Sequence, residues 1–225
     1  MIKICFVGAG STIFAKNVLG DCILTPELGE FEISLYDIDK ERLEDSRLML
    51  VNINKKYKGK ATIKATLNRR KALKDANFVV NAIQVGGYEP CTVTDFEVPK
   101  KYKLRQTIAD TLGIGGIFRA LRTIPVLEDI CKDMKDVCPK ALLINYANPM
   151  AMLTGYLQRY LWPNTVGLCH SVQCCVKGLF ESLKMNDLID HCKWEIAGIN
   201  HQAWLLKITD MNDNDLYPEI KKRSL

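Results

Sequence analysis

The scarce histidines are the residues whose types and spacing most directly suggest chemistry. The sequence has three histidines, and two of them stand beside other candidate ligands, in Cys169-His170 and Asn200-His201. A thiolate from Cys169 and an imidazole from His201, supplied by separate strand ends, can hold a divalent metal and leave positions open for substrate oxygens. The alternative is a core thiol and a hydrogen-bonded structural histidine, and the residue types alone slightly favour that alternative.

A glycine pair near the N-terminus has the spacing of a nucleotide-binding turn. Gly8-Ala9-Gly10 follows a short apolar run and opens a segment with helical spacing. The first glycine permits a tight turn, and the second lets the backbone approach a pyrophosphate at a helix N-terminus. Ile13 occupies the position of the third glycine, so the motif by itself is incomplete. The predicted cofactor contacts here are Gly8, Gly10, Ser11 and Thr12.

Asp37 and Asn81 follow two further predicted strands. Asp37 closes the strand at 31–36, where its carboxylate can accept hydrogen bonds from both ribose hydroxyls and would repel a 2′-phosphate. That arrangement favours NAD over NADP. The alternative is that Asp37 caps the next helix. Asn81, in the apolar run at 78–83, is a further candidate cofactor contact.

Two more polar residues lie in loops. Asp110 stands in the glycine-rich segment Thr107–Gly113, and Asn148 precedes Pro149 directly after an apolar run. Each has a purely structural alternative, as a turn cap and as a turn that ends a strand.

The elements that must position these residues follow from hydrophobic periodicity. The patterns predict helices at 41–57 and 118–136, with Pro125 as a possible kink, and no single regular element between 84 and 116. Strands are predicted at 3–7, 31–36, 61–66, 78–83, 141–145, 165–168, 193–199 and 203–208. This alternation predicts an α/β fold, a Rossmann-like doubly wound parallel sheet whose strand ends gather the polar residues at one edge.

Composition excludes several other classes of protein. The 225 residues carry a net charge of +5 in short basic clusters, which argues against a nucleic-acid partner. The sequence has no apolar run of membrane-spanning length and no export leader at Met1, so we expect a cytoplasmic protein. The nine cysteines should then be reduced, and most of them should be core residues.

The motifs together resemble those of glycoside hydrolase family 4, closest to its α-galactosidase branch. The resemblance covers essentially the whole chain, and its motifs occur in the family's order. They are Phe6-Val-Gly-Ala-Gly-Ser-Thr12, Gln84-Val-Gly-Gly-Tyr88, Ala109-Asp-Thr-Leu-Gly-Ile-Gly-Gly116, Asn145-Tyr-Ala-Asn-Pro149, Gly167-Leu-Cys-His-Ser171 and Gly198-Ile-Asn-His201.

The resemblance implies NAD+ and a divalent metal, usually Mn2+, as cofactors. It implies that Cys169 and His201 bind the metal and that Asn148 binds substrate. His170 matches the position of a proton donor that is often aspartate in relatives. Asp110 matches an acidic position thought to raise the basicity of a catalytic tyrosine. The implied reaction is oxidation at C3 of the sugar, loss of the C2 proton, elimination of the leaving group and addition of water at C1.

The resemblance also implies a substrate class. Phospho-glycosidase members carry an arginine after the segment that matches Val85–Tyr88, whereas Glu89–Asp95 contains no basic residue. We therefore expect an unphosphorylated α-galactoside, such as melibiose. The alternatives are a 6-phospho-glycosidase of the same family, an NAD-dependent 2-hydroxyacid dehydrogenase and a non-catalytic NAD-binding remnant.

The implied domain organisation is a nucleotide-binding domain at 1–150, similar to lactate and malate dehydrogenases, and the start of a second α/β domain at 151–225. The resemblance also implies that family members are about twice as long as this chain. We therefore expect a truncated chain that binds NAD but turns over poorly, with exposed apolar surface where the other half packs. The general base and the interface of a homo-oligomer are expected in that other half.

Overall fold

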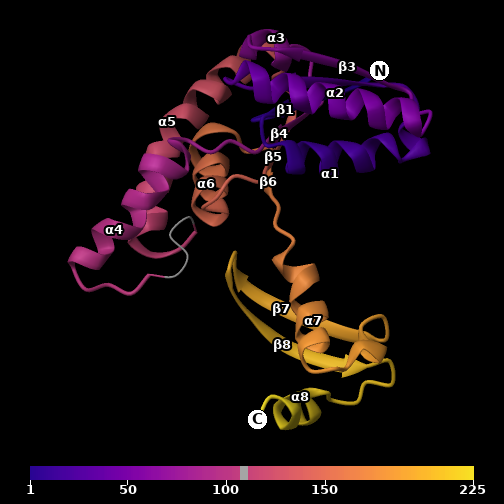
Figure 1. The fold of residues 1–225 in the computed structure, drawn as a ribbon, viewed down its shortest axis with the longest axis vertical. Coiled ribbons are helices and arrows are strands. Elements are labelled where there is room, and N and C mark those ends of the chain that lie inside the picture. The colour runs from indigo at the N-terminus through magenta and orange to yellow at the C-terminus, as the bar shows by residue number, and fades with distance from the viewer. Residues whose placement is uncertain (107–110) are drawn as a thin grey trace. The chain divides into compact units, whose positions relative to one another are not determined.

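The structure, a computed structural model, describes residues 1–106 and 111–225. Six parallel strands form one sheet in the order β3-β2-β1-β4-β5-β6 (Figure 1). They are β1 (Ile2–Val7), β2 (Phe31–Tyr36), β3 (Ala61–Thr66), β4 (Phe78–Asn81), β5 (Leu142–Asn145) and β6 (Thr165–Gly167). The strand order reverses between β1 and β4, the switch point at which open α/β sheets bind ligands. The expected doubly wound parallel sheet is confirmed.

The strands end in register, which brings the predicted site residues to one edge. Val7 pairs with both Tyr36 and Asn81, and Asn81 pairs in turn with Asn145. The residue that follows each of these strands therefore projects from the same edge of the sheet.

Helices cover both faces of this sheet (Figure 1). They are α1 (Thr12–Ile23), α2 (Lys40–Lys56), α3 (Arg69–Leu73), α5 (Gly113–Val137) and α6 (Met150–Tyr156), with short turns η1 (Pro26–Leu28), η2 (Gly87–Thr92) and η3 (Leu157–Leu161). A further helix, α4 (Val93–Lys101), packs against α5 and not against the sheet. Alternate residues of β1 enter different cores, because successive side chains of a strand point to opposite faces. Phe6 packs in a core that includes Leu19 of α1, and Val7 packs in a core that includes Leu127 of α5.

Two elements differ from the sequence-based expectation. A helix, α4, which the sequence did not predict, forms inside the segment expected to contain no single regular element, and α5 starts at Gly113 and continues through Pro125. Asp95 of α4 is 2% exposed and makes a two-point ion pair with Arg122 of α5. This long-range contact stabilises α4, which the local sequence does not.

The chain divides into two compact units, Met1–Leu168 and Cys169–Leu225. The division falls later than the expected boundary after residue 150, because β6 pairs with β5 and so belongs to the first sheet. The second unit contains α7 (Ser171–Ser182), η4 (Asn186–Leu188), β7 (Cys192–Ile199), β8 (Gln202–Asp210) and α8 (Tyr217–Arg223). Its two strands form an antiparallel hairpin over a small core that includes Phe180 and Ile208.

The nine cysteines are all free thiols, but the expectation that most lie in the core is wrong. Only Cys5, Cys131 and Cys138 are buried, and burial raises the pKa of each, to about 11 for Cys131 and Cys138. None of the helices in residues 1–106 and 111–225 has the length and apolar character needed to cross a bilayer.

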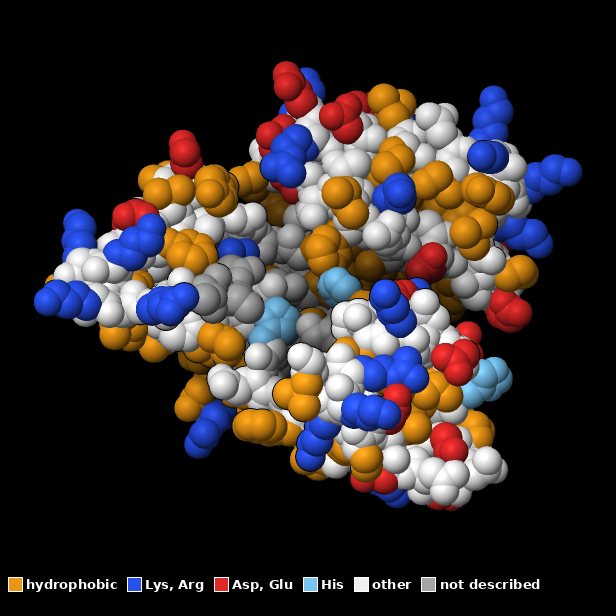
Figure 2. Space-filling view, turned by 60° about the horizontal axis from the view of Figure 1, so that its bottom comes forward, with side chains coloured by type: hydrophobic (Ala, Val, Ile, Leu, Met, Phe, Trp, Pro, Cys, Tyr) orange, Lys and Arg blue, Asp and Glu red, His pale blue; other side chains and the backbone are white. Residues whose placement is uncertain are grey.

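Charged side chains are spread over the surface. Basic and acidic groups alternate among the described residues on the face shown in Figure 2. Large apolar side chains are also exposed on the hairpin of the second unit, namely Ile199, Trp204 and Leu206.

Glu32 of β2 is a mostly buried carboxylate whose ion pairs should matter for stability. It is 9% exposed and lies between Lys64 and Lys3, with 3.1 Å from Oε1 to the Lys3 Nζ. Burial raises the pKa of this carboxyl, but hydrogen bonds from Lys64 and Lys3 outweigh burial and hold the pKa below its ordinary value of 4.5.

We expect Glu32→Gln to lower the free energy of unfolding by about 1–2 kcal/mol at pH 7, measured by urea denaturation. Because the folded-state pKa is depressed, the carboxylate stabilises the fold above pH 4.5 and loses that effect as the pH falls through the folded-state pKa. The difference between the variants should therefore shrink in acid. Glu44→Gln removes an exposed ion pair with Arg47 and serves as the control that changes little. Equal effects of the two substitutions would contradict the prediction.

Candidate functional site

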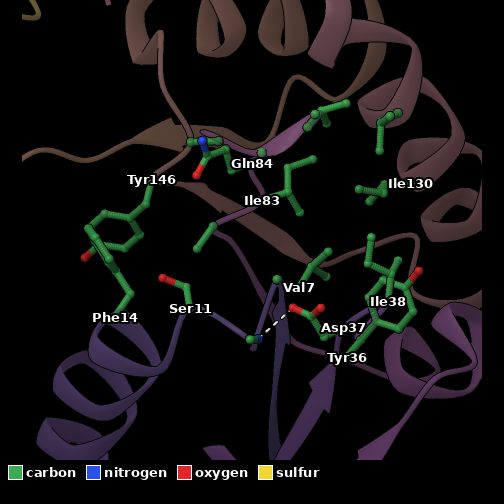
Figure 3. A pocket seen from close by; sticks show the side chains of 18 of the residues that line it. Val7, Ser11, Phe14, Tyr36, Asp37, Ile38, Ile83, Gln84, Ile130 and Tyr146 are labelled. Atoms are coloured by element: carbon green, nitrogen blue, oxygen red, sulfur yellow. Dashed lines mark hydrogen bonds between the residues drawn. The ribbon is translucent and has the colours of Figure 1, made fainter. Parts of the chain in front are cut away.

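A pocket of about 510 Å³ lies at the carboxyl edge of the first unit's sheet (Figure 3). Its walls come from the segments that follow β1, β2, β4 and β5, together with α5. It therefore sits at the switch point of the strand order, where the sequence predicted a ligand site.

Position 8, in the turn after β1, has room for glycine only. Gly8 has a φ of 90°, and a Cβ added there would lie 2.8 Å from the carbonyl carbon of Ala82. The backbone N–H groups of Gly8 and Ala9 both donate to the Tyr36 carbonyl, at 3.0 Å. Beneath the turn, the buried Ser46 hydroxyl donates to the Ala9 carbonyl at 2.6 Å. The backbone of the turn is thus fixed from two sides.

Asp37 is held by backbone donors beside this turn. Its Oδ2 accepts from the Gly10 N–H at 2.6 Å, and its Oδ1 accepts from the Asp39 N–H at 2.9 Å (Figure 3). Asp39, and not Asp37, caps α2, because the Asp39 carboxylate accepts from Glu41 and Arg42. The helix-cap alternative for Asp37 is therefore wrong. Each Asp37 oxygen keeps an acceptor lone pair for a ligand hydroxyl.

Of the other predicted cofactor contacts, one lines the pocket and two lie behind its lining. Ser11 lines the pocket at the start of α1. Thr12 does not line it; its hydroxyl lies 3.4 Å from the Gly10 carbonyl, on the side of Ser46.

Asn81 likewise lies beneath the pocket. It is fully buried, and its Nδ2 donates to Asn145 Oδ1 at 2.8 Å. Asn145 in turn accepts from the Ala147 N–H and donates to Thr154. This network supports the turn that carries Asn148, which does line the pocket. Asp110 lies outside the described residues.

Several pocket residues were not anticipated from the sequence. Phe14 and Tyr146 meet edge to face on one side of the pocket, with ring centroids 5.7 Å apart. The positions of Arg42, Arg69 and Arg119 on the pocket wall depend on helix packing. Of these residues, only Tyr146 could have been identified from the sequence as a pocket residue, because it directly follows a buried strand.

The second unit brings Cys169 and His201 together. Their Sγ and Nε2 atoms are 3.3 Å apart, although the residues are separated by most of that unit's sequence. Cys169 stands just before α7, and His201 occupies the hairpin turn with a φ of 59°. Cys169 is only partly buried, so the alternative of a core thiol is wrong, and His201 is exposed and hydrogen bonded to that thiol. His170 directly precedes α7, at its N-cap position, and is exposed.

Donors around the Cys169 sulfur favour its thiolate. Burial raises the pKa of this thiol, but hydrogen bonds from the Ser171 hydroxyl and N–H, from His201 and from Asn200 outweigh it and lower the pKa to about 7. The Ser171 Oγ and N lie 3.0 and 3.4 Å from the sulfur. The thiolate is the form that binds metals.

The donor set fits a metal with open coordination positions. A thiolate and an imidazole nitrogen are both ligands for borderline divalent ions. In residues 1–106 and 111–225, no three histidine, cysteine or acidic side chains gather at one point. Two protein ligands would leave the remaining positions for other oxygens, the arrangement of a catalytic site rather than a closed structural one.

Comparison with known proteins gives a consistent result. The profile described as "Family 4 glycosyl hydrolase" matches residues 3–185, and the profile of that family's C-terminal domain matches residues 196–224. An α-galactosidase of Bacillus subtilis (strain 168) is 60% identical over 224 residues, covering 100% of this chain and 51% of that protein. An α-galactosidase of Rhizobium meliloti (strain 1021) is 38% identical, covering 92% and 42%. The chain spans about half the length of these curated relatives.

Solved structures show the same fold. A 6-phospho-α-glucosidase from gut microorganisms, solved in complex with NAD and Mn2+, superposes with a TM-score of 0.83 at 24% identity, covering 99% of this chain and 50% of that one. Malate dehydrogenase from Plasmodium falciparum superposes with a TM-score of 0.66 at 18% identity, covering 100% and 64%. The expected similarity to the lactate and malate dehydrogenase fold is confirmed.

Gly10→Ala tests whether the contact between the turn and Asp37 builds the pocket. The new Cβ would lie 2.8 Å from Asp37 Oδ2 and so displace the carboxylate. If the pocket binds NAD+, the cofactor predicted from the sequence, we expect the affinity to fall about tenfold or more, measured by calorimetry. Gly20→Ala in α1, where nothing lies within 4 Å of an added Cβ, is the control and should leave binding unchanged. Normal NAD+ binding by the Gly10 variant would contradict this assignment.

Proposed function

The chain belongs to family 4 of the glycosyl hydrolases, and we propose that it supplies the NAD+ site and two metal ligands of an enzyme that hydrolyses unphosphorylated α-galactosides, such as melibiose. The observation that carries this proposal is the 3.3 Å approach of Cys169 Sγ to His201 Nε2. A plain dehydrogenase with the same sheet has no need of a thiolate and an imidazole held together in this way.

The first unit provides the dinucleotide site in this proposal. Gly8 and Gly10 would let the backbone approach the pyrophosphate, and Ser11 directly precedes the helix α1, whose first N–H groups would bind it. Asp37 accepts the ribose hydroxyls with the lone pairs that the backbone leaves unused, and its negative charge disfavours NADP. Thr12 and Asn81 act from beneath, through the turn and through Asn145.

The second unit provides the metal ligands. Cys169 and His201 would hold the divalent ion, which we take to be Mn2+, and Ser171 and Asn200 stabilise the thiolate form of the cysteine. Ser171 contacts the Cys169 sulfur with both its backbone N–H and its hydroxyl. These contacts orient the sulfur before any ion binds.

Three further residues complete the assignment. Asn148 on the pocket wall binds sugar hydroxyls, while Arg119 fixes its position by donating to its carbonyl at 3.2 Å. His170 serves as the proton donor to the leaving group, since an imidazole can exchange protons near neutral pH. Asp110, outside the described residues, keeps the role that the family resemblance implies for it, raising the basicity of a catalytic tyrosine.

When bound, NAD+ supplies a reversible hydride acceptor for C3 of the sugar, and the metal supplies positive charge for oxygens that become negative as C2 loses its proton. Because a hydride taken from C3 would be returned at the end of the cycle, the net reaction would be hydrolysis. The free thiols of the chain fit a reducing compartment, and we include a cytoplasmic location and a homo-oligomeric assembly in the proposal.

We expect Cys169→Ser to weaken Mn2+ binding by about tenfold or more, because an alcohol is a much poorer ligand than a thiolate. Electron paramagnetic resonance of free Mn2+ measures the change without any need for turnover. Cys174→Ser removes an exposed thiol of α7 and is the matched control. Equal Mn2+ binding by the Cys169 and Cys174 variants would rule out the assigned metal ligand.

Substrate class is tested with p-nitrophenyl α-galactoside and a p-nitrophenyl 6-phospho-glucoside, in the presence of NAD+ and Mn2+. Because Glu89–Asp95 supplies no cation for a phosphate, kcat/KM should favour the galactoside, by about tenfold or more. The assay is run on the purified 225-residue chain and on a fusion to the second half of the Bacillus subtilis α-galactosidase. A preference for the phosphorylated sugar would support the 6-phospho-glycosidase alternative instead.

A further inference from the structure

The pocket has an apolar end on one side of Asp37. Ile38 lines this end and is 89% exposed, which is unusual for a large apolar side chain beside a polar site. Val126 and Ile130 of α5 contribute further apolar surface. In Figure 3, Ile38 and Ile130 lie together on the side of Asp37 away from Phe14 and Tyr146. A ligand that covered Ile38 would gain from removing its surface from water.

Arg69 lines the same pocket and is held rigidly by α5. Its Nε donates to Asp133 Oδ2 at 2.6 Å, and its Nη2 donates to the Asp129 carbonyl at 3.3 Å. The Arg69 side chain is 26% exposed and that of Asp133 is 15% exposed. Burial raises the pKa of the Asp133 carboxyl, but hydrogen bonds from Arg69 and Arg70 outweigh it and hold the pKa below its ordinary value. The ion pair therefore persists across the neutral pH range.

This geometry suits a flat ring better than an anion. The charge of Arg69 is already balanced by Asp133, and two of its donors are occupied. Asp37, which lines the same pocket, adds a negative charge that opposes a phosphate. The faces of a guanidinium whose edge is hydrogen bonded can still stack on an aromatic ring.

We propose that Arg69, fixed by Asp133, forms with Ile38 and Ile130 a subsite that binds the adenine ring. This inference rests on the proposed function, because it assumes that the pocket binds NAD+. The stacked guanidinium supplies one polarisable surface and the isoleucines supply apolar contact, so the subsite selects a planar heteroaromatic base. Asp133 is a positioning residue in this arrangement, since it acts on the base through Arg69.

The test compares the binding of NAD+ and ADP-ribose to the 225-residue chain by calorimetry. Both ligands contain the adenine ring, and ADP-ribose lacks nicotinamide. We expect Arg69→Met to weaken both ligands by about tenfold, the same factor for each. Arg69→Lys keeps the charge but loses the plane, so it should weaken both ligands to a similar extent.

Arg70→Met is the matched control. Arg70 is the neighbouring residue of α3 and pairs with Asp133 and Asp136, both at 2.9 Å, but it does not line the pocket. This variant should lose both ion pairs between α3 and α5 and still bind both NAD+ and ADP-ribose as tightly as the unsubstituted chain.

The outcomes separate this inference from the proposed function. Failure of the unsubstituted chain to bind NAD+ would count against the proposed function and with it the subsite. Tight NAD+ binding that Arg69→Met leaves unchanged, or that Arg70→Met weakens equally, would overturn the subsite alone. Unchanged affinity in Arg69→Lys would also overturn the subsite, because it would show that a positive charge is sufficient and the planar guanidinium is not needed. Loss of NAD+ but not ADP-ribose would place Arg69 at the nicotinamide end and overturn the subsite as well.

Discussion

The hydrogen bond from the Gly10 N–H to Asp37 Oδ2 joins the two strand ends on which the proposed nucleotide site depends. It holds the carboxylate close enough to the turn that a methyl group on Gly10 has no room. The same carboxylate accepts from Asp39, so one side chain organises the end of β1 and the start of α2. Because these bonds orient the acceptor before any ligand arrives, little ordering is left for the binding step.

Much of the fold could be predicted from the sequence, because the strands of a covered parallel sheet are short apolar runs bounded by turn residues. The strands at 31–36 and 61–66 have the predicted bounds. The helix α4 could not be predicted, because its glycine- and proline-rich surroundings are overcome by one contact with a distant residue, the ion pair between Asp95 and Arg122. The boundary between the two units could not be predicted from local sequence patterns either, because it depends on the pairing of β6 with β5.

The candidate site shows the same division. Sequence spacing placed Asp37 at a strand end, but it could not distinguish a ligand acceptor from a helix cap, because that choice depends on where α2 begins. Ser46 and Arg69 gave no signal, since a hydroxyl or guanidinium on a helix becomes part of a site only through packing. Residue types offered Cys169 and His201 as a candidate pair, but they could not establish that the two meet, because their proximity requires a tight hairpin turn with a left-handed residue at its tip.

Cys169 and His201 both belong to the compact unit formed by residues 169–225, whose buried core is small. An ion that binds both side chains closes the loop between them. The unfolded segment has no such site, so the concentration of the ion affects the folding equilibrium of this unit. At a free concentration one hundred times its dissociation constant, such an ion raises the free energy of unfolding by about 2.7 kcal/mol. Metal supply would then govern the survival of the hairpin against proteases as well as its chemistry.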